Sequence, residues 1–172
     1  MEGEKFKIER ETFTFDLVPA TVDDVQDILA LNKKLFEYEN SQGFDDNLDT
    51  DWPETEEAVN EVSERVTSED SCGFVVKCEG KTVAYLVGLI LEEETGRADS
   101  RYAELEHMFT DETFRGKGLG EKLVESFKQW AKDHGIKKLS VNVSFLNKDA
   151  IRFYEKVGLI PSDLRLTMSL ES

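Results

Sequence analysis

Apolar residues recur along this chain with two different periods. Over residues 21–36 they recur every three to four positions, which predicts a helix with one buried stripe. Thr21 and Asp24 have the spacing of a capping box at the start of this helix. A second helix is predicted from Pro53, because proline suits a first helical turn and small apolar residues follow at helical spacing. An acidic loop, residues 40–52, joins the two helices.

Strand patterns and two further helices make up the rest of the chain. Glu79 and Gly80 separate two apolar runs and predict a hairpin turn. An amphipathic helix is expected over residues 118–134, and Asn147 is a good N-cap for a last helix that ends at Gly158. Strands are predicted over residues 12–20, 72–78, 81–91, 101–110, 137–145 and 164–170.

The predicted order is strand, helix, helix, strand, strand, strand, helix, strand, helix, strand. This order indicates an α/β protein, with a mixed sheet and helices on its faces. At 172 residues the chain is expected to form one domain, 1–172. It has no apolar run long enough to cross a membrane, and its charged first ten residues do not resemble a signal peptide. We therefore expect a cytoplasmic protein.

The composition argues against a metal site and against several classes of partner. Cys72 and Cys78 have no metal-ligand spacing, and the two histidines belong to no ligand-like cluster, so no metal site is expected. The net charge of −16 argues against nucleic acid and anionic membranes as partners. Residues 1–114 carry 10 basic and 30 acidic side chains, whereas residues 115–172 carry 11 and 7. Either this asymmetry only serves solubility, or the basic part binds an anion and the acidic part a cation.

The basic part begins with the stretch RGKGLGEKL, residues 115–123, which lies between a predicted strand and a predicted helix. The first backbone N–H groups of a helix have no intrahelical partner and lie at the positive end of its dipole. Glycines let a ligand approach these groups closely, and Arg115 and Lys117 add positive charge. The stretch therefore predicts a phosphate or pyrophosphate site. Its glycine spacing is neither the dinucleotide fingerprint nor a Walker loop.

Two motifs resemble those of the GCN5-related N-acetyltransferases, the GNAT superfamily. The first is Arg115-Gly116-Lys117-Gly118-Leu119-Gly120, which is similar to the family signature R/Q-x-x-G-x-G/A. The second is NKDAIRFYEKVGL, residues 147–159, with a predicted strand between the two. The resemblance implies a GNAT-like, mostly antiparallel central sheet flanked by helices, and acetyl-CoA as the co-substrate.

The resemblance also implies where acetyl-CoA binds. The pyrophosphate is expected on the backbone of the glycine stretch. The pantetheine arm is expected to pair, like an added strand, with the backbone of the strand that precedes it. Asn147 occupies the family position that contacts this arm, which is compatible with its role as an N-cap. The expected cofactor-binding residues are Met108, Phe109, Thr110, Arg115, Gly116, Lys117, Gly118, Leu119, Gly120, Asn147 and Tyr154.

The catalytic residues are expected from the same resemblance. An amine must lose a proton to attack a thioester, and Glu104 and Glu106 lie where family members place a carboxylate base. Tyr154 matches the tyrosine that donates a proton to the departing thiolate, and the backbone N–H of Met108 matches the oxyanion donor. Strand alternation places Glu104 and Glu106 on one side together with Met108 and Thr110. Leu105, His107 and Phe109 then lie on the other side, with His107 partly buried.

The sequence defines the acceptor of the acetyl group less clearly than it defines the cofactor. In this family the first two helices and their loop form the acceptor wall, and here that region is rich in acidic side chains. This favours a primary amine on a cationic small molecule, such as a polyamine, an aminoglycoside-like compound or a basic amino acid. A protein N-terminal or lysine acetyltransferase, and a non-catalytic acyl-CoA-binding module, stay open as alternatives. A homodimer through the last strands is a further expectation from the resemblance.

Overall fold

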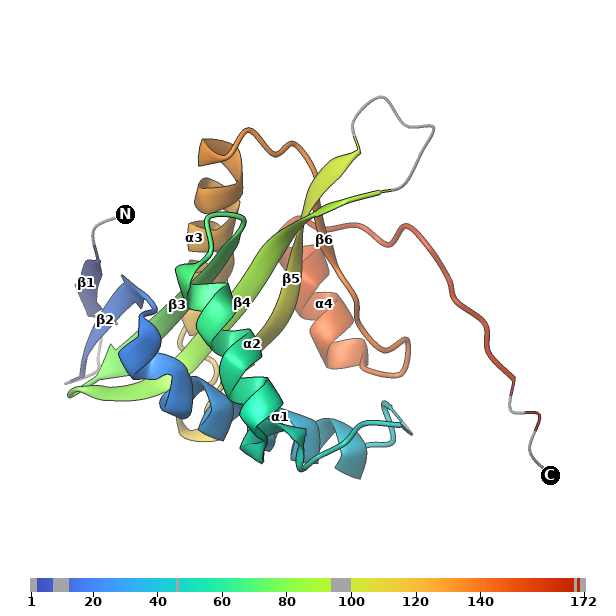
Figure 1. Cartoon of the computed structure of the whole chain (residues 1–172), viewed down its shortest axis with the longest axis horizontal. Helices are drawn as coiled ribbons and strands as arrows, with labels where there is room; N and C mark the ends of the chain where they lie inside the picture. Colours follow the sequence, from blue (N-terminus) through green and yellow to red (C-terminus); the bar gives the residue numbers. More distant parts are fainter. Residues whose placement is uncertain (1–2, 8–12, 46, 94–99, 169, 171–172) are drawn as a thin grey trace.

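The structure, a computed structural model, describes residues 3–7, 13–45, 47–93, 100–168 and 170. At its centre is a sheet that has six strands in these residues, ordered in space as in the sequence (Figure 1). The strands from β1 to β5 pair antiparallel, whereas β5 and β6 pair in parallel. The strands are β1 (Glu4–Lys7), β2 (Thr14–Pro19), β3 (Ser71–Cys78), β4 (Lys81–Glu92), β5 (Arg101–Thr110) and β6 (Leu139–Val141).

Helices cover both faces of this sheet. In β4, Tyr85 and Val87 lie in the core formed with α1 and α2, whereas Ala84 and Leu86 lie in the core formed with α3. Because both faces of β4 are buried, its sequence is a continuous apolar run without alternation. No helix in the described residues is both long and apolar enough to cross a membrane. The helices are α1 (Val25–Ser41), α2 (Glu56–Thr67), α3 (Leu119–Asp133) and α4 (Lys148–Lys156).

The chain passes from β2 into α1 through the predicted capping box. One carboxylate oxygen of Asp24 accepts hydrogen bonds from the N–H and the hydroxyl of Thr21, at 2.9 and 3.1 Å. The other oxygen lies 2.6 Å from the Lys77 ammonium. Burial by itself would raise the pKa of Asp24, but the ion pair and the hydrogen bonds outweigh it and hold the pKa below its usual value. The first turn is the 3₁₀ helix η1 (Val22–Asp24), and α1 continues from it.

The second helix begins later than the sequence predicts. Pro53 lies in a separate 3₁₀ turn, η2 (Trp52–Glu54), and α2 begins at Glu56. The cap is Thr55, whose side chain accepts a hydrogen bond from the Ala58 N–H at 3.2 Å. A threonine that satisfies a free N–H group is a stronger start signal than a proline, which only tolerates the first turn.

Both ends of the chain differ from the predicted strand pattern. In the range of the strand predicted over residues 164–170, the described residues 164–168 and 170 form no strand and extend away from the sheet, and residue 169 lies outside the described residues (Figure 1). The sheet instead has β1, whose Phe6 stacks on Phe15 with ring centroids 5.5 Å apart. β1 was not predicted because only one of its four residues is apolar. β6 is also shorter than its predicted range and only partly buried, because the sheet has no further strand beyond it among the described residues.

Gly88 of β4 lies directly beneath Phe127 of α3. A Cβ atom on Gly88 would be 2.6 Å from Phe127 Cε2 and 2.7 Å from the Glu104 carbonyl oxygen. Neither a buried ring nor a strand backbone can move aside cheaply. We expect Gly88→Ala to lower the free energy of unfolding in urea by about 1–3 kcal/mol. Gly43→Asn is the control, because asparagine tolerates a positive φ and a Cβ there meets no atom within 4 Å. Equal stability of the two variants would contradict the packing argument.

Candidate active site

A cavity opens where β5 and β6 part. The two strands share three residue pairs, from Ala103 with Leu139 to Leu105 with Val141. β5 then continues to Thr110, whereas the chain after β6 leads to α4. The cavity between them has a volume of about 550 Å³. Of the predicted site residues, it is lined by Met108, Phe109, Thr110, Arg115, Gly116, Gly118, Leu119, Gly120, Asn147 and Tyr154.

A β-bulge in β5 explains why the strands part at this place. Val87 of β4 lies opposite His107 and Gly88 lies opposite Leu105, so Glu106 is an extra residue without a partner in β4. A bulge bends its strand and increases the local twist. The pairing with β6 ends at Leu105, the residue before the bulge. The edge of β5 beyond it has no partner strand in the described part of the chain, so a ligand could pair with the backbone there, although the Thr110 carbonyl oxygen already accepts a hydrogen bond from Arg115 Nε.

The bulge also changes which side chains share a face. Glu106 contacts Arg65 of α2, and the His107 ring lies 5.6 Å from the Phe36 ring of α1. Met108 instead packs against the core beneath α3. The predicted alternation, with Glu106 and Met108 on one side and His107 on the other, is therefore wrong. It failed because strict alternation assumes that no residue is inserted in the strand.

The glycine loop leads into α3 as predicted. Gly116 and Gly118 have φ values of 74° and 77°, in the left-handed region that favours glycine. A Cβ atom at either position would meet no atom within 4 Å, so the backbone here faces open space. Gly118 caps α3, and the N–H groups of the first turn lie at the positive end of a 15-residue helix. This backbone is well suited to bind the pyrophosphate of acetyl-CoA.

Gly120 has a different function in the structure. A Cβ on Gly120 would lie 3.2 Å from Phe153 Cζ, so the missing side chain lets α4 approach α3. Beside this contact, Lys156 of α4 forms an ion pair with Glu121 of α3 at 2.6 Å. Leu119 is buried in the core. The third glycine and its neighbour therefore shape the cavity by packing.

Asn147 begins α4 in the predicted way. Its side-chain oxygen accepts a hydrogen bond from the Ala150 N–H at 3.1 Å, and Asn147 is 8% exposed. It lies at the cavity while it performs this local role. A contact with the pantetheine arm stays a prediction.

Tyr154 lines the cavity from α4. Its ring makes an edge contact with Phe153, with centroids 5.3 Å apart, and is partly buried. Burial raises the pKa of the Tyr154 hydroxyl, and the charge of Glu39 raises it further. The hydroxyl is therefore protonated at neutral pH and can act as a hydrogen-bond donor in the cavity.

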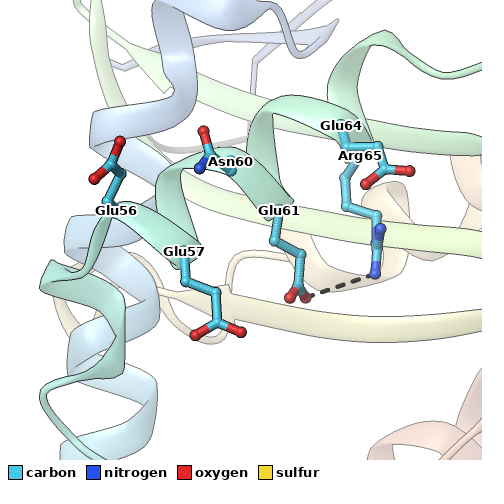
Figure 2. A pocket seen from close by; sticks show the side chains of 6 residues that line it. All are labelled: Glu56, Glu57, Asn60, Glu61, Glu64 and Arg65. Carbon is cyan, nitrogen blue, oxygen red and sulfur yellow. Dashed lines mark ion pairs between the residues drawn. The ribbon is translucent and has the colours of Figure 1, made fainter.

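The two predicted bases lie beside the cavity and do not line it. Both carboxylate oxygens of Glu106 accept hydrogen bonds from Arg65, at 2.7 and 3.0 Å, and a charge pair of this fork geometry is strong. Arg65 also lies 3.6 Å from Glu61, as the dashed line in Figure 2 shows. For Glu104, burial and the charge of Glu106 raise the pKa, while a hydrogen bond with Asn142 lowers it. Glu106 is thus held by Arg65, whereas Glu104 has no ion pair among the described residues that line this side of β5 and its pKa is raised.

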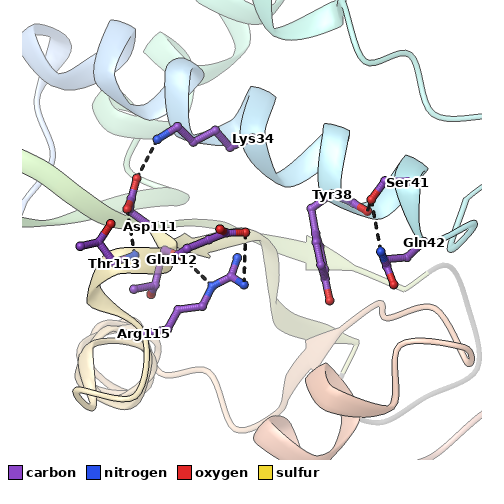
Figure 3. Close-up of polar contacts among 9 residues, drawn as sticks. Lys34, Tyr38, Ser41, Gln42, Asp111, Glu112, Thr113 and Arg115 are labelled. Atoms are coloured by element: carbon purple, nitrogen blue, oxygen red, sulfur yellow. Dashed lines mark hydrogen bonds and ion pairs between the residues drawn. The ribbon is translucent and has the colours of Figure 1, made fainter.

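Two residues of α1 near this site, Tyr38 and Glu39, belong to the acidic and aromatic region that the sequence assigns to the acceptor wall. Tyr38 lines the cavity beside Arg115 (Figure 3). Burial raises the pKa of Glu39, and Asp45 raises it further. Only Tyr38 of the two lines the cavity, and no local signal in the sequence separates it from its neighbours. The described residues contain no group of three or more metal-ligating side chains.

The chain belongs to the acetyltransferase (GNAT) family, which its sequence matches over residues 32–159. Enzymes of this family take an acetyl group from acetyl-CoA. The predicted family and α/β fold are thereby confirmed.

Relatives and solved structures agree with this assignment. The uncharacterized N-acetyltransferase MJ1207 of Methanocaldococcus jannaschii is 29% identical over 147 residues, covering 84% of this chain and 60% of that protein. Human N-acetyltransferase 8B is 27% identical over 101 residues, covering 58% and 44%. This chain thus spans about half the length of these relatives.

Two solved structures share the fold. The tetramutant of the BH1408 protein from Bacillus halodurans has a TM-score of 0.77 and 23% identity, covering 90% of this chain and 99% of that one. The aminoglycoside N-acetyltransferase AAC(6')-Iy in complex with CoA has a TM-score of 0.73 and 15% identity, covering 95% and 99%.

His107 is expected to make stability depend on pH. Burial lowers the pKa of His107 below the usual 6.5, so the folded protein binds this proton less readily than the unfolded chain. The contribution of neutral His107 is therefore fully present above pH 6.5 and is lost as the pH falls below that value. In urea unfolding at a series of pH values, His107→Gln should lose less stability than wild type on acidification. Parallel pH profiles of the two proteins would contradict this.

Proposed function

We propose that this protein transfers the acetyl group of acetyl-CoA to a primary amine on a cationic small molecule, by direct attack in a ternary complex. The observation that carries the proposal is the cavity itself. It brings together the open edge of β5, the glycine loop at the N-terminus of α3 and the hydroxyl of Tyr154. These three features come from separate parts of the chain, and each suits a different part of a thioester substrate.

The residues around the cavity fit acetyl-CoA. The backbone of residues 115–120 would hold the pyrophosphate, with Lys117 adding charge beside it. The backbone of Met108, Phe109 and Thr110 would pair with the pantetheine arm along the open edge of β5. Asn147 would contact the same arm. When bound, acetyl-CoA supplies the activated acetyl group.

The side chains then have separate roles in moving protons. Glu104, or Glu106 once it is released from Arg65, would receive the proton of the amine through water, because neither carboxylate lines the cavity. Tyr154 would donate a hydrogen bond or a proton to the departing sulfur. The backbone N–H of Met108 would stabilise negative charge on the carbonyl oxygen.

An acidic surface on α2 supports a cationic acceptor. A groove of about 500 Å³ runs along α2 and is lined by Glu56, Glu57, Glu61 and Glu64 together with Asn60 and Arg65 (Figure 2). Arg65 links this groove to β5, because it lies 3.6 Å from Glu61 and donates hydrogen bonds to Glu106. Such a surface attracts cations and repels anions. A lysine-bearing peptide has the same charge, so protein acetylation is the second candidate.

A rate assay against a panel of amines tests the proposal. The release of free thiol from acetyl-CoA would be measured at about pH 8, where a useful fraction of amine is neutral. The panel comprises polyamines, aminoglycosides, basic amino acids and lysine-bearing peptides. We expect turnover with one of the small cationic classes. Turnover with peptides alone would favour the second candidate, and CoA binding without turnover would favour a non-catalytic acyl-CoA-binding module.

Tyr154→Phe provides the matched variant for this assay, because it removes one hydroxyl and keeps the ring that packs on Phe153. With the active amine, we expect kcat to fall by about 10²-fold. The affinity for CoA, measured by calorimetry, should stay near the wild-type value. An unchanged kcat would exclude Tyr154 as the proton donor.

We also propose a cytoplasmic location and a homodimer formed through the C-terminal segment. This segment carries alternating apolar residues that are largely exposed, with Leu164 at 64%, Leu166 at 84% and Met168 at 82%. Strand-like alternation without a partner in the described residues favours pairing with a second copy of this chain.

Changing this apolar face to charge should weaken a dimer. We expect the double variant Leu166→Lys with Met168→Lys to raise the dimer dissociation constant by about tenfold or more, measured by analytical ultracentrifugation. Thr167→Lys is the control, because it adds charge to the opposite face of the same segment. A wild-type protein that is monomeric at high concentration would contradict the proposal.

A further inference from the structure

Arg115, the first residue of the glycine loop, contacts α1 as well as β5. Its Cζ atom lies 5.5 Å from the centre of the Tyr38 ring and 5.1 Å from that of Phe109. Its Nε donates a hydrogen bond to the Thr110 carbonyl oxygen at 3.1 Å. Figure 3 shows Arg115 reaching from the loop toward Tyr38 on α1. The residue thus joins the loop, the end of β5 and the wall of α1.

A second contact fastens α1 to the same connection. Lys34 lies one helical turn before Tyr38, and its ammonium is 2.7 Å from the Asp111 carboxylate (Figure 3). Asp111 in turn caps the 3₁₀ turn η3 (Glu112–Phe114) by accepting a hydrogen bond from the Thr113 N–H at 3.2 Å. Two neighbouring side chains of α1 are therefore held by the segment between β5 and the glycine loop.

The shape of a guanidinium allows Arg115 to have several partners at once. Its faces can pack on aromatic rings while its edges donate hydrogen bonds in a fixed fork. Here the faces are used by Tyr38 and Phe109, and Nε by Thr110. The terminal nitrogens have a weaker contact, 3.8 Å from Glu112. They are the atoms that a phosphate on the loop would engage, and this would not require the rings to be released.

Tyr38 connects this cluster with the acceptor side. It lines the cavity that the glycine loop and Tyr154 also line. α1 ends three residues later at Ser41, and the acidic loop follows. Tyr38 thus lies at the cavity and close to the acidic loop that the family resemblance assigns to the acceptor wall.

We propose that Arg115 is a positioning residue that couples the cofactor site to the acceptor wall, by holding Tyr38 against β5 while a phosphate engages its terminal nitrogens. This inference rests on the proposed function. In this coupling, binding of the cofactor's phosphate at the glycine loop orders the last turns of α1 and so raises the affinity for the acceptor. Because coupling is reciprocal, the acceptor then raises the affinity for the cofactor by the same factor.

Hydrogen exchange with CoA as the probe tests this coupling without the need for an acceptor. In the wild type, CoA should slow amide exchange in peptides that cover residues 34–45. Tyr38→Leu removes the ring and leaves the loop intact, so it should bind CoA within about threefold of the wild-type affinity. It should nevertheless lose the slowing in α1. Tyr38→Phe keeps the ring and should behave as wild type.

Two further variants test whether the response in α1 requires the planar guanidinium of Arg115 or only a positive charge. Arg115→Lys keeps a cation for the phosphate but lacks the planar group, so CoA should bind without slowing exchange in α1. Lys138→Gln removes a cation–π contact with Tyr102, 5.6 Å from the ammonium to the ring centre, at the opposite end of β5 from the residues that line the cavity, and should keep the full response. With an active amine, Tyr38→Leu should raise the acceptor KM about fivefold and leave kcat nearly unchanged.

The outcomes separate a failure of the coupling from a failure of the proposed function. If CoA binds to the wild type but exchange in α1 does not change, or if Tyr38→Leu keeps the response, the coupling is refuted and the proposed function stands. If CoA does not bind to the wild type, the proposed function fails and the coupling fails with it. Loss of the response in both Tyr38→Leu and Arg115→Lys, with CoA still bound, supports the coupling.

Discussion

One extra residue in β5 determines the geometry on which the cavity depends. Because Glu106 has no partner in β4, the strand bends there and its pairing with β6 ends one residue earlier. The bend leaves the edge at residues 108–110 without a partner strand in the described sheet. It also directs Met108 toward α3 and His107 toward α1, so that both helical layers contribute to the surroundings of the cavity.

The bulge is held by electrostatics as well as by packing. Arg65 of α2 neutralises Glu106 with two hydrogen bonds, so the extra carboxylate is not left uncompensated beneath the helix. Glu61 and Glu104 remain nearby with raised pKa values, because burial and the charge of Glu106 both disfavour their ionised forms. Arg65 thus joins the acidic surface of α2 to the carboxylate of Glu106 on β5.

Much of the fold and part of the site could be predicted from local patterns. The hairpin at Glu79 and Gly80, the capping box of α1 and the range of β5 depend on neighbouring residues, and all three were predicted. The glycine loop was also predicted, because backbone that must be free of side chains needs glycine in a recognisable order. The bulge at Glu106 could not be predicted, since an inserted residue has no local signature when both faces of the strand are partly buried.

The sequence by itself therefore determined the class of fold, the family and the glycine loop at the start of α3, because helical and strand periods and glycine spacing are properties of short segments. The tertiary structure alone decided that Glu106 pairs with Arg65, that Gly120 makes room for Phe153 and that Arg115 lies over Tyr38. Each of these contacts joins residues at least 30 positions apart. Such contacts depend on the angles at which the helices cross the sheet, and no local pattern encodes those angles.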